Sequence, residues 1–127
     1  MTTPTLDKNF YLRMLDAIPL PVYLFQDGDL IFFNQAFIDL SGYGRNEIPT
    51  IDFLDFVHSD HRETLLNQTR AALSRNMKNL PQESKLRIVR KDGETKWVKV
   101  LPRLVEHNAL PAVLGVVIEI TEDTPTV

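Results

Sequence analysis

The chain has 127 residues, 43% of them hydrophobic and 24% charged, with a formal net charge of −3 and no cysteine. This composition fits one globular domain and excludes a disordered or coiled-coil chain, while the lack of cysteine excludes disulfides, thiolate catalysis and cysteine-bound zinc. The acidic balance provides no basic stripe, so we expect no nucleic-acid partner.

The N-terminal half of the chain predicts a helix, a hairpin and a second helix. Residues 5–18 form the first helix, whose apolar residues recur every four positions and which ends before two prolines. Strands at 21–26 and 30–33 flank an Asp-Gly-Asp turn. Asn34 then caps a short helix over 35–40, which ends at a glycine.

The second half predicts one long helix and three strands. Residues 43–57 contain one or two short helical turns. The long helix covers 61–77, and Asp60 followed by Glu63 resembles a capping box at its start. The predicted strands are 86–90, 95–101 with an extension through 104–105, and 112–120.

This order of elements predicts an α+β fold: a five-stranded antiparallel sheet, helices inserted between the second and third strands, and an N-terminal amphipathic helix. We divide the chain into a cap helix (1–20), a core (21–122) and a C-terminal exit segment (123–127). The last strand is apolar on both faces, so both faces of the sheet need a cover. Either the N-terminal helix or a second subunit would cover the face opposite the inserted helices.

Several short motifs, in order, resemble those of a PAS domain. They are Asp-Gly at 27–28, Asn-Gln-Ala-Phe at 34–37, Gly-Tyr at 42–43, Glu47, Val-His-Ser-Asp-His-Arg at 57–62, Lys-Asp-Gly at 91–93, Trp-Val at 97–98, and the segment from Gly115 to Ile-Thr-Glu at 120–122. Each motif alone is weak, but together they cover residues 8–122.

The resemblance implies a sensory module that forms a homodimer and regulates an output domain, such as the histidine kinase of a two-component system. The lack of cysteine fits a cytoplasmic location. It implies dimerisation through the N-terminal helix and the outer face of the sheet. The apolar runs at 18–25 and 111–118 are shorter than the roughly 18 residues of a membrane span, so we expect no direct membrane insertion. The predicted interface consists of Leu6, Phe10, Met14, Trp97, Leu114, Val116 and Ile118.

We expect no cofactor. Photosensory relatives attach flavin through a cysteine, which this chain lacks, and the positions that would contact a flavin ring are Val98 and Val117. Heme-binding relatives use a histidine on the long helix, whereas His58 and His61 come at or before its start and fit a turn and cap. His107 fits a solvated turn. We expect no metal at His58, Asp60, His61 and Asp55.

An apolar set of residues is expected between the sheet and the inserted helices. It forms either a filled core, which we favour, or a pocket for a small apolar ligand hydrogen-bonded by Tyr23 or Tyr43. Two alternatives to a sensor are a ligand-free docking module and a small cavity enzyme using Asp39, Asp52 or Asp55. The set comprises Phe33, Phe37, Leu40, Leu54, Leu66, Leu73, Leu86, Ile88, Val98, Val100 and Val117.

Overall fold

The computed structural model of the protein describes residues 7–73 and 81–122, without the side chains of residue 69 and residues 71–73. Helices and strands follow the predicted order. The elements are α1 (Lys8–Ala17), β1 (Val22–Gln26), β2 (Asp29–Phe33), α2 (Gln35–Ser41), the 3₁₀ helices η1 (Ile48–Thr50) and η2 (Phe53–Phe56), α3 (Ser59–Leu73), β3 (Ser84–Val89), β4 (Thr95–His107) and β5 (Leu110–Glu119).

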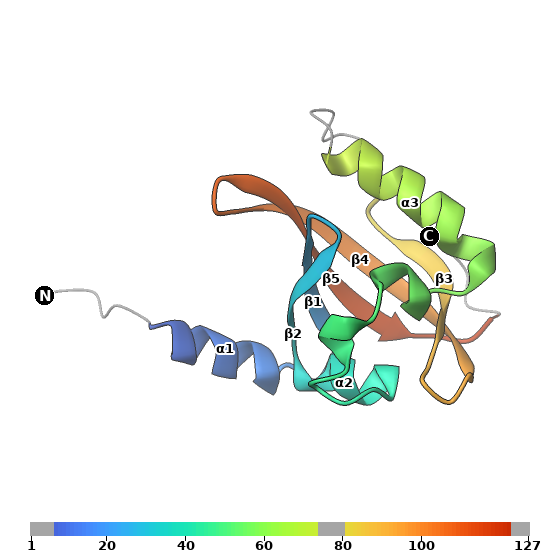
Figure 1. Ribbon diagram of the computed structural model, residues 1–127, viewed down its shortest axis with the longest axis horizontal. Helices are drawn as coiled ribbons and strands as arrows, with labels where there is room; N and C mark the ends of the chain where they lie inside the picture. The colour runs from blue at the N-terminus through green and yellow to red at the C-terminus, as the bar shows by residue number, and fades with distance from the viewer. Residues whose placement is uncertain (1–6, 74–80, 123–127) are drawn as a thin grey trace, which may run out of the picture.

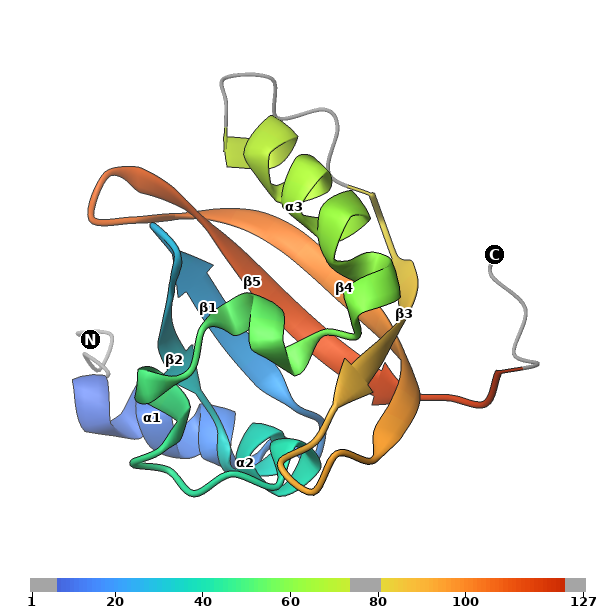
Figure 2. The same ribbon diagram turned by 45° about the vertical axis from the view of Figure 1, so that its right-hand side comes forward.

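The five strands form one antiparallel sheet in the order β2-β1-β5-β4-β3. The last strand in sequence therefore lies at the centre of the sheet. Helices α2 and α3 and the two 3₁₀ helices lie on one side of the sheet, which we call the inner face (Figures 1 and 2). The α+β prediction is confirmed.

Helix α1 does not cover the opposite face of the sheet, which we call the outer face. It projects away from the body of the protein (Figure 1), and none of its residues is buried. Its apolar side chains Phe10, Tyr11 and Met14 are 37%, 48% and 44% exposed. The N-terminal helix of the same chain therefore does not cover the outer face, and that predicted cover is wrong.

The start of α3 also differs from the prediction. The helix begins at Ser59, and Asp60 lies in its first turn instead of capping it. The backbone amide of Asp60 donates to Nδ1 of His58 at 3.1 Å, and the Asp60 carboxylate pairs with Arg87 on β3. A histidine ring thus caps the helix where the sequence suggested a carboxylate, and residues 74–77 of the predicted helix lie outside the described residues.

Strand β4 runs without interruption through Pro102, which the sequence treated as a break. Pro102 pairs with Gly115 on β5, whereas β3 pairs with β4 only between Thr95 and Val100. At Pro102 the strand therefore has a neighbour on one side only. Proline is tolerated at such an edge-like position, because its missing amide hydrogen is not needed on the free side.

The core lies between the inner face and the helices. Val98 is fully buried at 0% exposure, and Val117 and Leu86 lie beside it on neighbouring strands. Aromatic rings close this layer from the helical side, since Phe37 of α2 contacts Tyr23 and Phe56 with ring centroids 6.0 and 5.7 Å apart. The core is therefore built largely from strand valines below and aromatic rings above.

Candidate functional site

A small cavity of about 50 Å³ lies between the inner face and the helices. Its walls come from β1, α2, η2, α3 and the last three strands. Among the described residues, no charged side chain lines it. The lining residues are Tyr23, Phe37, Leu40, Ser41, Phe53, Phe56, Val57, Leu65, Leu86, Ile88, Val89, Val100 and Val117.

Only some residues of the predicted apolar set line this cavity. Phe37, Leu40, Leu86, Ile88, Val100 and Val117 line it. Val98 is buried in the core without lining it, and Phe33 packs against the Phe37 ring at 6.0 Å between centroids.

For Leu54 and Leu66 the prediction was one residue out of phase. Their neighbours Phe53 and Leu65 line the cavity instead. The side chain of Leu73 lies outside the described residues. On η2 and on α3, two apolar residues follow each other in the sequence. The pattern alone therefore did not determine which of the two faces inward.

Tyr23 is the lining residue most relevant to ligand binding. It is 6% exposed and pairs with Gly115 across β1 and β5. A methyl group added at Gly115 would overlap the Tyr23 ring and hydroxyl, so the phenol lies flat across the glycine on the inner face. Burial raises the pKa of Tyr23 above its ordinary value, which keeps the hydroxyl protonated and able to donate a hydrogen bond.

The other polar side chain at this cavity is Ser41, and it is satisfied within the chain. Its hydroxyl donates to the Ile38 carbonyl at 3.0 Å and accepts from the Tyr43 amide at 3.1 Å. Ser41 thus completes the C-terminal turn of α2. A ligand in the cavity would find apolar side chains and the Tyr23 hydroxyl.

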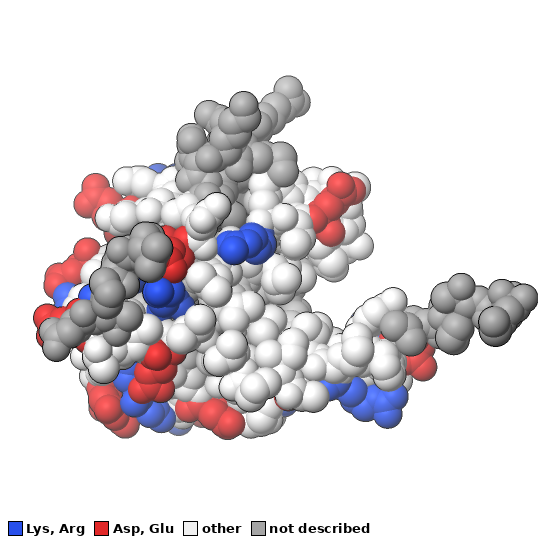
Figure 3. Space-filling model, turned by 180° about the vertical axis from the view of Figure 1, so that it is seen from behind, with Lys and Arg blue, Asp and Glu red and all other residues white. Residues whose placement is uncertain are grey.

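The outer face of the sheet carries the predicted interface residues of β5. Leu114, Val116 and Ile118 alternate with the inward residues and pair with Arg103, Leu101 and Lys99 of β4. All three are partly exposed. Seen from behind the view of Figure 1, the molecule has a mainly uncharged centre with charges near its margins (Figure 3).

Trp97 also lies on the outer face, but it already has neighbours within the chain. The Nζ atom of Lys85 and the guanidinium carbon of Arg87 each lie 5.1 Å from its ring centroid, and the ring of His61 lies 5.7 Å away. Its neighbour Val98 points to the core. Of the other predicted interface residues, Leu6 lies outside the described residues.

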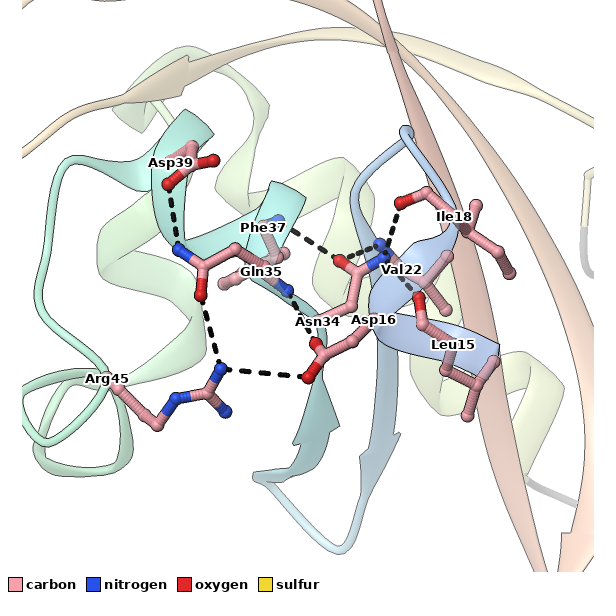
Figure 4. A network of polar contacts seen from close by, with 9 residues as sticks. All are labelled: Leu15, Asp16, Ile18, Val22, Asn34, Gln35, Phe37, Asp39 and Arg45. Carbon is pink, nitrogen blue, oxygen red and sulfur yellow. Dashed lines mark hydrogen bonds and ion pairs between the residues drawn. The ribbon is translucent and has the colours of Figure 1, made fainter. Parts of the chain in front are cut away.

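Asn34 joins α1 to the core through a network of hydrogen bonds (Figure 4). Its side chain is fully buried, at 0% exposure. Its Oδ1 accepts from the amides of Val22 at 2.9 Å and Phe37 at 3.1 Å. Its Nδ2 donates to the carbonyls of Leu15 at 3.0 Å, Ile18 at 3.3 Å and Leu20 at 2.9 Å.

The sequence predicted only the capping bond of Asn34. A second link supports it: Asp16 of α1 accepts from the Gln35 amide at 2.9 Å and lies 3.9 Å from the Arg45 guanidinium (Figure 4). Together these contacts make the start of α2 the point where α1 is attached. No spacing rule could have shown this, because the partners of Asn34 are backbone carbonyls.

Comparison with known proteins decides the family. Residues 19–122 match the PAS domain family. The chain belongs to this family. Among curated proteins, none gives a significant match.

Solved PAS structures share the fold at low sequence identity. A PAS domain from Desulfitobacterium hafniense superimposes with a TM-score of 0.71 at 16% identity, covering 85% of this chain and 99% of that one. A PAS domain from a two-component sensor histidine kinase gives 0.72 at 14% identity, covering 88% and 95%. The LOV protein of Rhodobacter sphaeroides gives 0.68 at 18% identity, covering 93% and 70%.

The residues of this PAS domain do not fit a flavin. Val98 and Val117 stand where the resemblance places the contacts to the ring, and neither can pair with its polar edge. An unpaired polar group in a dry site costs about 1–3 kcal/mol. The cavity of about 50 Å³ is also far below the roughly 300 Å³ at which ligand pockets of drug-sized molecules begin.

The histidines of the PAS domain serve local structure. His58 caps α3, as the turn-and-cap interpretation predicted. His61 is partly buried against Trp97 and Arg87, and this burial, with the nearby Arg87 charge, lowers its pKa. His107 is not a solvated turn residue, because its Nδ1 lies 2.9 Å from Oε1 of the largely buried Gln26.

The remaining acidic candidates face solvent. Asp39 accepts from Gln35 at 3.0 Å, Asp52 caps η2 through the Leu54 amide at 3.0 Å, and Asp55 is exposed. None of the three lines the cavity. Within residues 7–73 and 81–122, no group of three or more His, Asp or Glu side chains is placed to bind a metal. Over the same residues, no helix has the length and apolarity needed to cross a bilayer.

Proposed function

We propose that this PAS domain is a non-enzymatic sensory module of the cytoplasm that forms a homodimer and regulates an output domain. The observation that carries the proposal is the pair of apolar surfaces that the chain leaves open. Phe10 and Met14 are exposed on α1, and the β5 side chains of the outer face are partly exposed. Burying such surfaces against a second copy would remove them from water.

The link between sensing and output would run through Asn34. A change in the inner cavity alters how β1 and α2 pack, since Tyr23 and Phe37 line that cavity. The neighbouring Val22 and Phe37 amides donate to Asn34, which also donates to the Leu15 carbonyl near the end of α1. A ligand that binds one arrangement better than another would shift the position of α1 in the dimer.

Analytical ultracentrifugation of Leu114→Asp/Ile118→Asp tests the interface. We expect the wild type to sediment as a dimer at micromolar concentration and the variant as a monomer, because two carboxylates would be buried in the interface. The matched control is Gln82→Asp/Asn108→Asp, which places two carboxylates at exposed positions. A folded double variant that remains dimeric would contradict an outer-face interface.

A ligand-free docking module is the second candidate, and the size of the cavity favours it. A volume of about 50 Å³ holds only a few atoms, and an apolar cavity of this kind can stay empty. Native mass spectrometry separates the two candidates. A sensor with a bound ligand carries an extra mass that is lost on denaturation, and a docking module has the bare mass of the chain.

A further inference from the structure

A cleft of about 360 Å³ lies beside the segment that joins α1 to β1. We call it the linker cleft, because Pro19, Leu20 and Pro21 of that segment form one of its walls. It has only Leu40 and Val117 in common with the inner cavity. In contrast to that cavity, it is lined by charged side chains, so it is a separate site with a different chemistry.

Two of the four charged side chains in the linker cleft neutralise each other. The Nζ atom of Lys96 lies 2.9 Å from Oε1 of Glu119, and this contact raises the pKa of Lys96 above its ordinary value. Arg90 and Asp39 form no ion pair within residues 7–73 and 81–122. Asp39 accepts one hydrogen bond, from the neutral Gln35 amide at 3.0 Å. The cleft therefore contains one cation and one carboxylate that lack an opposite charge.

The guanidinium of Arg90, directly after β3, is partly buried without a polar partner. Its Nε atom is the one buried side-chain nitrogen or oxygen of the described residues that has no hydrogen bond. The guanidinium lies over Gly42 at the end of α2, where an added methyl group would lie 3.4 Å from Nη2. A positive charge withdrawn from water is unfavourable unless an anion and hydrogen-bond acceptors compensate it. These features indicate an anionic partner from outside the chain, and a carboxylate matches the geometry of a guanidinium.

The other walls of the linker cleft restrict what carries this carboxylate. Asp39 would repel a ligand with several negative charges, such as a phosphate, and could accept hydrogen bonds from an ammonium group. The apolar side chains of Leu20, Leu40 and Val117 line the same cleft. Its volume of about 360 Å³ lies above the roughly 300 Å³ at which pockets for small molecules begin. The matching ligand is small, with one carboxylate, one ammonium group and an apolar body.

We propose that the linker cleft binds an α-amino acid with an apolar side chain, whose carboxylate pairs with Arg90 and whose ammonium group pairs with Asp39. Such a ligand contacts the segment after α1 and the end of β5 together, since Leu20 and Glu119 both line the cleft. The Leu20 carbonyl accepts from Asn34 at 2.9 Å, so the ligand lies next to the attachment of α1. This inference goes beyond the proposed function, because binding here requires neither a dimer nor the inner cavity.

The test uses three probes of similar shape in NMR titrations of the full chain. L-Leucine carries both charged groups, 4-methylpentanoate lacks the ammonium group, and L-leucinamide lacks the carboxylate. We expect the wild type to bind L-leucine most tightly. Arg90→Gln should weaken binding of L-leucine and 4-methylpentanoate at least about tenfold, the value of one hydrogen bond to a charged group, without weakening that of L-leucinamide.

Asp39→Asn should show the opposite selectivity. It should weaken binding of L-leucine and L-leucinamide by a similar factor without weakening that of 4-methylpentanoate, because only the first two probes carry an ammonium group. The matched controls are Arg13→Gln and Asp29→Asn, each of which removes one exposed charge outside the linker cleft. Neither control should change the affinity for any probe.

The outcomes separate this inference from the proposed function. If the wild type binds no probe at millimolar concentration, or if Arg90→Gln affects all three probes alike, the inference is wrong. The homodimer and the inner cavity are unaffected by that result, because sedimentation and native mass spectrometry test them. A further readout needs no ligand: the thermal stability of Arg90→Gln should equal or exceed that of the wild type. A clear loss, absent in Arg13→Gln, would contradict the inference by showing that Arg90 already has a partner within the chain.

Discussion

The inner face of the sheet and helix α1 are held in place by different forces. Residues on the inner face are buried among valines and aromatic rings, with Val98 at 0% exposure. In α1, no residue is buried, and the helix is attached by hydrogen bonds to Asn34 and by the contacts of Asp16. Apolar packing is spread over many contacts, whereas the attachment of α1 is concentrated in a few polar groups.

This contrast indicates where a signal could act. A closely packed core resists change, because displacing any one side chain disturbs its neighbours. A helix held by a few hydrogen bonds can change its position when those bonds are exchanged, at a cost that a ligand or partner can supply. Asn34 lies at the boundary of the two regions.

Asn34→Ala should have the largest effect, a loss of about 3 kcal/mol in the free energy of unfolding. The change leaves the amides of Val22 and Phe37, and the carbonyl groups at and just after the end of α1, without their partner, and each buried unpaired group costs about 1–3 kcal/mol. Urea denaturation measures the loss. Gln35→Ala, at the neighbouring exposed position, is the control and should stay within about 0.5 kcal/mol.

Gly115→Ala should cost about 1–3 kcal/mol, because its methyl group would overlap the Tyr23 ring in a packed layer. The cause can be isolated by repeating the change in a Tyr23→Leu background, where the cost should shrink. Gly44→Ala faces only the flexible Glu47 side chain and is the control. An equal cost of Gly115→Ala in both backgrounds would show that Tyr23 is not the obstacle.

Stability should also depend on pH through His61. Its folded-state pKa is lowered, mainly by burial and then by the Arg87 charge, so folding favours the neutral ring. The free energy of unfolding is therefore expected to fall as the pH decreases below about 6.5, the ordinary histidine value. Asp60 and His58 also face this ring and modify its pKa in opposite directions.

Comparison of the wild type with His61→Gln isolates this contribution, because carboxylates that titrate elsewhere are common to both proteins. Urea denaturation at pH 7.5 and pH 5.0 gives the change in unfolding free energy for each. The wild type should lose more than the variant on acidification. Equal losses in the two proteins would contradict the expectation that contact with Trp97 and Arg87 lowers the pKa of His61.

Phe10→Ser/Met14→Ser should have the smallest effect on the folded monomer, within about 0.5 kcal/mol, because both side chains are exposed on α1. The same variant should weaken the dimer, since these side chains belong to its proposed interface. Urea denaturation and sedimentation equilibrium measure the two effects separately. If the variant loses stability but associates as the wild type does, both side chains stabilise the fold of a single chain and not the dimer.

Local patterns in the sequence were sufficient for most of the fold. Alternation predicted the strands to within a few residues, and the Asn34 cap and the glycine at the end of α2 were read correctly. The path of α1 was not predictable in this way. Its amphipathic pattern indicates that an apolar face needs a partner, and it does not say whether the partner is the same chain.

The candidate site was only partly predictable for the same reason. Phe37, Val100 and Val117 were assigned correctly because helix and strand periods fix their direction. Tyr23 was expected only as a hydrogen-bonding group, because its position over Gly115 depends on the pairing of β1 with β5, strands far apart in the sequence. Sequence spacing carries no information on such a contact.

Native mass spectrometry of the purified protein, compared with its denatured mass, tests the central claim most directly. A sensory module that works as a homodimer with an occupied cavity should appear as a dimer carrying an extra mass that disappears on denaturation. A bare monomer at micromolar concentration would contradict the account, since neither the outer face nor the cavity would then have the partner inferred for it.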